Sequence, residues 1–234
     1  MIERRPYNAL GAANHGWLDA KHHFSFANYY DRNRMHWGNL RVWNDDTIAA
    51  QTGFDTHPHK EMEIITYVRQ GAISHRDSLG NDGKTIAGDV QVMSAGSGIY
   101  HSEYNHENEA TQIFQIWILP TMASAKGAPS WGTRPFPKTD RAGKFVVLAS
   151  GIEGDDALPI RTNARVLGAT ISAGNTVEYH FAATQRYGYL VPAQGTVEIN
   201  GVKIEKGDGA AIHGESVIRV TALTNAEVVL VDTQ

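Results

Sequence analysis

Short runs of β-branched and aromatic residues, separated by glycine, asparagine and proline, most strongly limit how this chain can fold. The clearest runs span residues 63–68, 114–119, 145–148, 196–199 and 227–231. Runs of this length are typical of strands, and helical periodicity is scarce in the rest of the chain. The sequence therefore predicts an all-β protein built as a sandwich or barrel, with at most one or two short helices.

The two halves of the sequence share one pattern, in which a strand, a glycine turn and a second strand precede a Gly-Asp pair. The matching positions are Tyr67, Gly71, Gly88 and Asp89 in the first half and Tyr189, Gly195, Gly207 and Asp208 in the second. Between them, residues 120–143 carry four prolines and three glycines, which indicates a connection. We expect a duplicated β-barrel, with an N-terminal domain over 1–130 and a C-terminal domain over 131–234.

Composition excludes several classes of protein. The net charge of −4 and the lack of a long basic run argue against direct nucleic-acid binding. The absence of cysteine excludes disulfides and thiolate ligands. No stretch approaches the roughly 18 apolar residues of a membrane span. We expect a cytoplasmic protein that does not bind membranes, with a monomer as the default state.

Histidine is unevenly distributed, because nine of the eleven lie in the first 106 residues. The sequence Thr56-His57-Pro58-His59 places two of them at positions i and i+2. Such side chains point to the same face of a strand, so both imidazoles would enter one space. Pro58 cannot donate to a strand ladder, which predicts an edge strand or a bulge here.

A second pair has the same spacing. His101 and Glu103 follow a glycine-rich turn after the predicted strand at 90–93. On neighbouring strands the two pairs would supply three imidazoles and one carboxylate, which suit Fe(II), Mn(II), Co(II), Ni(II), Cu(II) or Zn(II). The sequence thus predicts one metal in the first half, with open positions for water, substrate or dioxygen.

These motifs resemble those of the cupin superfamily. The first cupin motif corresponds to Gly53, His57, His59, Glu63 and Gly71, and the second to Gly88, Gly96 or Gly98, His101 and Asn105. Compared with the usual cupin motifs, the Gly53–His57 spacing is shorter and the Glu63–Gly71 spacing is longer by one residue. Ser94 stands where proline is usual. These departures, and the strings at residues 14–19, 23–30, 41–46, 53–59 and 93–103, look like the pirin family, and within it the bacterial members with quercetin dioxygenase activity.

The resemblance implies a bicupin in which only the N-terminal barrel holds metal. It places the metal ligands at His57, His59, His101 and Glu103, with Fe(II) as the first choice of metal. Many cupins use the glutamate of the first motif instead, which leaves Glu63 as a competitor of Glu103. The second half has no His-x-His pair, in agreement with a degenerate cupin domain.

The resemblance also implies a function, quercetin 2,3-dioxygenase activity. A flat aromatic substrate such as a flavonol would react with dioxygen and release carbon monoxide, with Glu103 as the catalytic base. The alternative is a non-enzymatic, metal-containing regulator that senses redox state and acts through protein partners. A different cupin reaction, such as isomerisation or decarboxylation, is a third hypothesis.

The remaining histidines and the aromatic residues have simpler interpretations. His15, His22, His23 and His36 are expected on the surface or in packing, although one could line the pocket mouth. We expect His75 and His106 to face solvent, and no second metal at His180 or His213. Seven aromatic residues could wall a pocket for a flat ligand but are more often core residues: Trp17, Phe24, Phe26, Tyr29, Tyr30, Trp37 and Trp43.

Overall fold

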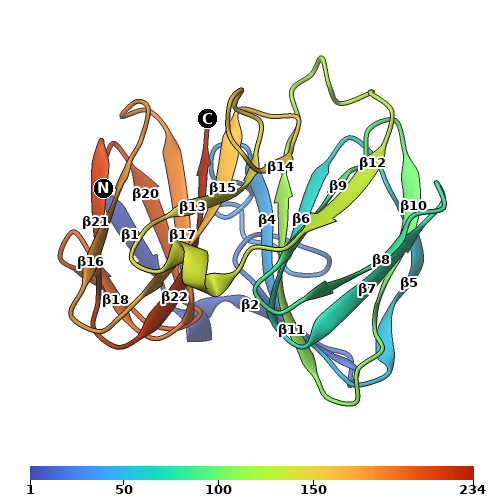
Figure 1. Cartoon of the computed structure of the whole chain (residues 1–234), viewed down its shortest axis with the longest axis horizontal. Helices are drawn as coiled ribbons and strands as arrows, with labels where there is room; N and C mark the ends of the chain where they lie inside the picture. Colours follow the sequence, from blue (N-terminus) through green and yellow to red (C-terminus); the bar gives the residue numbers. More distant parts are fainter.

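The β-branched runs form the strands of two barrels that lie side by side in the computed structural model, which describes residues 1–234 (Figure 1). Each barrel combines one seven-stranded and one four-stranded sheet. Two short 3-10 helices, η1 (Tyr7–Ala9) and η2 (Lys138–Arg141), are the only helical segments. The all-β prediction with a few short helices is confirmed.

The first barrel contains most of the N-terminal half. Its seven-stranded sheet has the order β12 (Ser130–Arg134), β9 (Val90–Ser94), β6 (Glu63–Gln70), β11 (Thr111–Ile118), β4 (Leu40–Ile48), β3 (Leu18–His22) and β2 (Gly11–Asn14). Its four-stranded sheet has the order β5 (Thr52–His59), β10 (Ile99–Asn105), β7 (Ala72–Asp77) and β8 (Asp82–Ile86).

The second barrel contains most of the C-terminal half. Its seven-stranded sheet has the order β1 (Ile2–Arg5), β20 (Gly209–His213), β17 (Tyr187–Gln194), β22 (Ala226–Thr233), β15 (Ala164–Ile171), β13 (Val146–Ser150) and β14 (Leu158–Pro159). Its four-stranded sheet has the order β16 (Thr176–His180), β21 (Val217–Ala222), β18 (Val197–Ile199) and β19 (Val202–Ile204).

The strand order repeats between the barrels, as the shared sequence pattern predicted. The run β9-β6-β11-β4 corresponds to β20-β17-β22-β15, and β5-β10-β7-β8 corresponds to β16-β21-β18-β19. The glycine turns match as well, because Gly71 and Gly195 have φ values of 74° and 76°. Glycine adopts this left-handed conformation without the steric cost that other residues incur.

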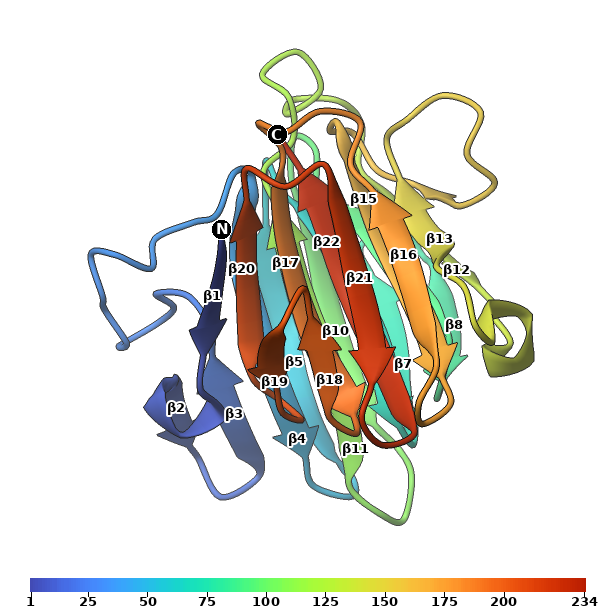
Figure 2. The ribbon, with the colours of Figure 1, turned by 90° about the vertical axis from the view of Figure 1, so that its left-hand side faces the viewer.

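Two segments of the chain do not follow a simple division into an N-terminal and a C-terminal barrel. The N-terminal strand β1 pairs with β20 of the second barrel, antiparallel over four residues (Figure 2). The segment 120–143, predicted as a connection, contains η2 and also β12, which pairs with β9 at the edge of the first barrel. The predicted domain boundary at 130/131 therefore falls at β12, and the division stays a prediction.

The largest hydrophobic cluster lies between the two seven-stranded sheets and contains 23 buried residues, among them Trp43, Phe114, Tyr189 and Val229. A second cluster of 18 residues fills the second barrel. Inside the first barrel the clusters are smaller, with 6 and 4 residues. The first barrel therefore has room for polar side chains in its interior, and the second does not. No helix here has the length and apolar character that a membrane crossing requires.

Candidate metal centre

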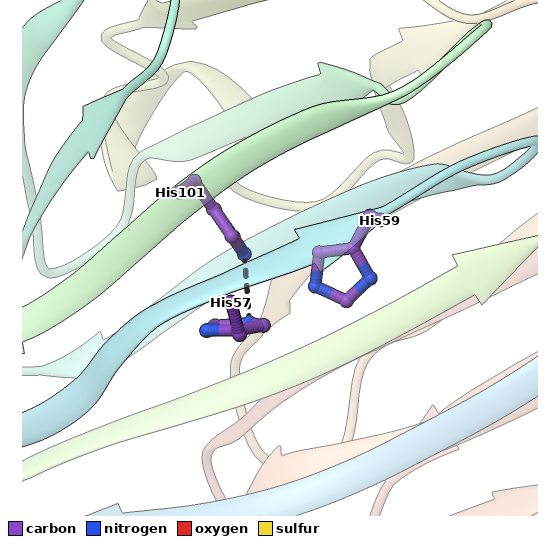
Figure 3. A group of neighbouring side chains, drawn as sticks. All are labelled: His57, His59 and His101. Carbon is purple, nitrogen blue, oxygen red and sulfur yellow. Dashed lines mark hydrogen bonds between the residues drawn. The ribbon is translucent and has the colours of Figure 1, made fainter.

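The predicted imidazoles come from two adjacent strands of the small sheet in the first barrel. His57 and His59 lie on β5, at the edge of that sheet, and His101 lies on the neighbouring β10 (Figure 3). The register places His101 directly opposite His57. The edge position of β5 agrees with Pro58, which has no N–H to donate to a further strand.

A β-bulge sets the direction of these side chains. The register between β5 and β10 shifts, because His101 lies opposite His57 whereas Glu103 lies opposite Phe54. A step of two positions along β10 thus matches a step of three positions along β5, so β5 carries one extra residue. Bulges of this kind change the direction in which side chains point. As a result Phe54 and His57 both line the same cavity although they are three positions apart.

The three imidazoles meet closely enough to share one ion. Their ligating nitrogens all lie within 4.8 Å of one another. The Nε2 atoms of His57 and His101 are 3.1 Å apart. Two nitrogens bound to a metal at right angles, each about 2.1 Å from the ion, would lie about 3 Å apart. The donor set therefore fits a divalent transition metal, with the rings turned toward a common space (Figure 3).

Burial favours the neutral form of His59 and His101, which is the form that binds a metal. Loss of water contact, aided by the neighbouring histidines, lowers the pKa of His59 to about 4 and the pKa of His101 to about 3. His57 is oriented by its own strand, because its Nδ1 lies 2.6 Å from the carbonyl oxygen of Asp55. An N–H donated there leaves the Nε2 lone pair of His57 free to bind a metal.

Glu103 is buried in the same pocket and held by three donors. Its Oε1 accepts hydrogen bonds from Thr66 Oγ1 at 2.9 Å and Gln91 Nε2 at 2.7 Å, and its Oε2 accepts one from Gln115 Nε2 at 2.7 Å. Donors on both oxygens suit a carboxylate, which only accepts hydrogen bonds. The tight cluster of ligating atoms comprises the three histidines alone, so the ligand role of Glu103 stays a prediction.

Glu63, the competing glutamate, has a different environment. It is buried at the start of β6, where its Oε2 accepts a hydrogen bond from Ser94 Oγ at 2.6 Å. Burial raises the pKa of its carboxyl group, although Ser94 and Arg161 oppose the shift. Glu63 lines neither the histidine cluster nor the adjacent cavity. This position is the one expected of a residue that supports the barrel.

A cavity of about 190 Å³ lies beside the histidines, between the two sheets of the first barrel. Its walls are formed by Leu18, Ala20, His22, Phe26, Asn44, Asp46, Phe54, His57, His59, Glu103, Gln115 and Trp117. The expectation that one upstream histidine lines a pocket holds for His22. Of the seven aromatic candidates only Phe26 lines it, while Phe24 and Trp43 belong to the core between the barrels. The sequence patterns missed Phe54 and Trp117.

The wall opposite the histidines is polar and comes from β4. Asn44 and Asp46, at positions i and i+2, face the cavity from the seven-stranded sheet. The Nδ1 of His22 is 2.9 Å from Asn44 Oδ1, and Oδ1 of Asp46 is buried without a hydrogen-bond partner. Burial, with the charges of Asp45 and Glu103, raises the pKa of Asp46 well above its ordinary value. Burial therefore favours the neutral form of Asp46, which can donate a hydrogen bond.

One expectation from the sequence was wrong. His75 was expected to face solvent, but its side chain is fully buried behind His101, and only His106 of that pair is exposed. His75 Nε2 lies 2.9 Å from Asp77 Oδ2. The signal was present as a His-x-Asp pair with the spacing of the other two motifs. The buried position of His75 depends on the pairing of β7 with β10, which could not be predicted from the sequence.

Comparison with known proteins places these features in a family. The pirin family model matches residues 3–118, and the model described as the quercetinase C-terminal cupin domain matches residues 147–233. A pirin-like protein of Caulobacter vibrioides is 66% identical over 99% of both chains. The quercetin 2,3-dioxygenase of Escherichia coli K12 is 43% identical over 99% of this chain and 98% of its own.

Solved structures agree with the sequence comparisons. A bacterial pirin from Escherichia coli, crystallised in complex with nickel(II), superimposes with a TM-score of 0.92 at 41% identity, covering 100% of this chain and 99% of that one. A quercetin 2,3-dioxygenase from Acinetobacter baumannii gives a TM-score of 0.79 at 20% identity, covering 99% and 85%. At that identity the second likeness supports the two-barrel fold alone.

Proposed function

The chain belongs to the pirin family, and from this membership and its histidine cluster we propose that it is a metal-dependent dioxygenase that opens the central ring of a flavonol. Dioxygen is consumed and carbon monoxide is released. The observation that carries the proposal is the convergence of three imidazoles beside a cavity whose wall also bears a carboxylate. The relative named quercetin 2,3-dioxygenase supports the choice of reaction.

The ligands in this proposal are His57, His59, His101 and Glu103, around one divalent transition metal. Iron(II) is our first choice, and nickel(II), present in the related bacterial pirin, is the main alternative. When bound, the metal supplies a Lewis acid that lowers the pKa of a coordinated hydroxyl group. Four protein ligands leave positions for the vicinal hydroxyl and ketone oxygens of a flavonol.

Glu103 acts as the base in this scheme. Its carboxylate faces the cavity and is fixed by Thr66, Gln91 and Gln115, so it can take the proton of the substrate hydroxyl without first reorienting. Oε1 already accepts two hydrogen bonds and Oε2 accepts one, so the remaining lone pair of Oε2 is the one open to the metal or to the proton. The three donors also restrict the side chain to one position, which favours proton transfer over a short, fixed distance.

The other residues that line the cavity select the substrate. Phe26, Phe54 and Trp117 provide apolar contact for a flat ring, and neutral Asp46 donates a hydrogen bond to a substrate oxygen. The volume of about 190 Å³ lies below the roughly 300 Å³ at which pockets usually enclose a drug-sized ligand. We therefore place the chelating end of the flavonol inside the cavity and the remainder at its mouth.

The test uses the full-length protein loaded separately with Fe, Mn, Co, Ni or Cu. Each form is incubated with quercetin in air, and the loss of the flavonol absorption band and the release of carbon monoxide are followed. We expect turnover with at least one metal, and none for His101→Ala. His180→Ala, which changes an exposed histidine of the second barrel, is the matched control. Band loss no faster than in the metal-only blank for all five metals would reject the reaction and favour the regulator.

A further inference from the structure

A fully buried pair of residues lies behind His101, on the side away from the cavity. His101 Nδ1 is 3.3 Å from His75 Nδ1, and His75 Nε2 is 2.9 Å from Asp77 Oδ2. The side chains of His75 and Asp77 are both 0% exposed. The strand β7 places them there, because Asp77 is the register partner of His101 and His75 is the partner of Glu103.

We propose that Asp77 and His75 are positioning residues that set the tautomer of His101 and aim its Nε2 lone pair at the metal. The inference rests on the metal ligation by His101 in the proposed function, and it is independent of the reaction that the metal supports. It assigns a role to a buried histidine that the ligand set leaves unused.

Asp77 determines which group donates in each of the hydrogen bonds that link it through His75 to His101. Its Oδ1 accepts hydrogen bonds from the backbone N–H groups of Leu79 and Asn81, and its Oδ2 accepts one from Asn81 Nδ2. A carboxylate accepts all of these and still has a lone pair for His75. Burial alone would raise the pKa of Asp77, but the hydrogen bonds from His75, Asn81 and Leu79 together lower it below its ordinary value. Asp77 therefore accepts, and His75 Nε2 must donate.

The remaining proton positions follow by elimination. A neutral imidazole has one N–H, so His75 with its proton on Nε2 accepts at Nδ1. His101 must then donate from Nδ1, which leaves its Nε2 without a proton. His57 also uses its Nδ1, toward the carbonyl of Asp55. Two unprotonated Nε2 atoms thus face each other at 3.1 Å, an arrangement that repels unless a cation lies between them.

The hydrogen-bonded series Asp77–His75–His101, called the relay below, is held in place and shielded from water by Trp131. The indole of Trp131 stacks on the ring of His75, with ring centroids 4.7 Å apart and planes 5° apart. Gly83 is the strand partner of His75, and a Cβ there would lie 2.3 Å from the Trp131 ring. The missing side chain of Gly83 is therefore what gives the indole its place over His75.

Hydrogen bonds of this type, from a metal-bound histidine to a carboxylate, fix ring orientation and increase ligand basicity, and their loss typically weakens metal binding 10–100-fold. Here a second imidazole separates the ligand from the carboxylate. His101 is thereby tied to a charged group, whereas His57 is tied only to a backbone carbonyl. We expect His101 to be the most firmly oriented of the three ligands.

Asp77→Asn tests the relay, because the side chain keeps its shape but presents a donor to His75 where the carboxylate presented an acceptor. The two backbone N–H groups at Oδ1 hold the amide oxygen there, so the NH₂ group faces His75. His75 must then accept at Nε2 and donate from Nδ1, which moves the proton of His101 to Nε2, on the metal side. His75→Phe, which keeps the ring on Trp131, removes the acceptor for His101. Arg76→Gln, an exposed site between them, is the control.

The measurements are nitrogen-15 NMR of the histidine rings in metal-free protein and zinc(II) affinity by competition with a chromophoric chelator. We expect His101 protonated at Nδ1 and His75 at Nε2 in the wild type. Zinc should bind about 10–100-fold more weakly to both relay variants and unchanged to Arg76→Gln. A wild-type His101 protonated at Nε2 overturns the proposal, even if the variants fail to fold. A folded Asp77→Asn protein with wild-type affinity and ring shifts also overturns it. If the wild type itself does not bind zinc, the proposed metal site falls as well.

Discussion

The two barrels share one strand order but have opposite interiors. On β5 and β10 the first barrel turns His57, His59, His101 and Glu103 inward. On the equivalent strands β16 and β21, the second barrel turns Val177, Tyr179, Ile218 and Val220 into an 18-residue apolar cluster. The difference shows that topology provides the scaffold, while the inward-facing side chains decide whether a barrel carries a site or only a core.

The division of roles has a physical basis. A barrel interior lined with neutral imidazoles and a carboxylate loses hydrophobic stabilisation, because those groups must be desolvated and kept in hydrogen bonds. The second barrel and the 23-residue cluster between the sheets supply apolar burial that the first barrel lacks. The larger apolar cluster inside a barrel and the candidate metal site thus lie in different halves of the molecule, which leads to four predictions.

The largest effect should come from removing an imidazole of the first barrel. We expect His57→Ala or His101→Ala to reduce bound metal from near one ion per chain to near zero, and flavonol turnover to the blank. The matched change in the second barrel, His180→Ala, should retain wild-type metal content. Elemental analysis of the purified proteins measures the metal content. Metal retained by both first-barrel variants would contradict the difference proposed between the two barrels.

A truncation in the second barrel should act on stability alone. Leu230 is fully buried in its apolar cluster. Leu230→Ala should lower the free energy of unfolding by about 2–5 kcal/mol, since it leaves a cavity. Because the site lies in the other barrel, metal affinity should change less than about twofold. Urea unfolding and a zinc titration measure the two quantities, and a large loss of affinity would show that the barrels are coupled.

The buried histidines of the first barrel should make metal-free protein sensitive to acid. In the folded state the pKa values of His59 and His101 are about 4 and about 3, against 6.5 for free histidine. The unfolded chain therefore takes up protons first. Their contribution to the free energy of unfolding is complete above about pH 6.5 and is lost as pH falls toward 3. Urea unfolding at several pH values should show this slope, and His59→Gln/His101→Gln should flatten it. Equal pH dependence in the wild type and the double variant would show that His59 and His101 are not the source of the acid sensitivity.

The smallest effect concerns Asp46, the unpartnered acid on the polar wall. Asp46→Leu makes this wall resemble the second barrel, so we expect the free energy of unfolding to rise by about 1 kcal/mol. Flavonol kcat/KM should fall roughly tenfold, because a hydrogen bond to substrate is lost. Asp46→Asn, which can still donate, should keep most of the activity. Unchanged kinetics in Asp46→Leu would remove Asp46 from the substrate site.

The sequence was enough to predict the features that depend on local spacing. Strand-length runs gave the all-β class, the Gly-Asp repeat gave the duplication, and two pairs at i and i+2 gave three converging imidazoles. The bulge between Phe54 and His57 and the contacts of Phe54 and Trp117 depend on the register between strands. The same is true of His75, whose buried position results from pairing between β7 and β10. The pairing of β1 with β20 joins residues about 200 positions apart, which no local pattern encodes.

The most direct test of this division of roles is anomalous X-ray diffraction from crystals of metal-loaded protein. We predict one ion per chain in the first barrel, about 2.0–2.2 Å from the imidazole nitrogens of His57, His59 and His101 and from a Glu103 oxygen. We predict no ion inside the second barrel. An anomalous peak elsewhere, or an ion in the first barrel without these imidazoles, would contradict this prediction.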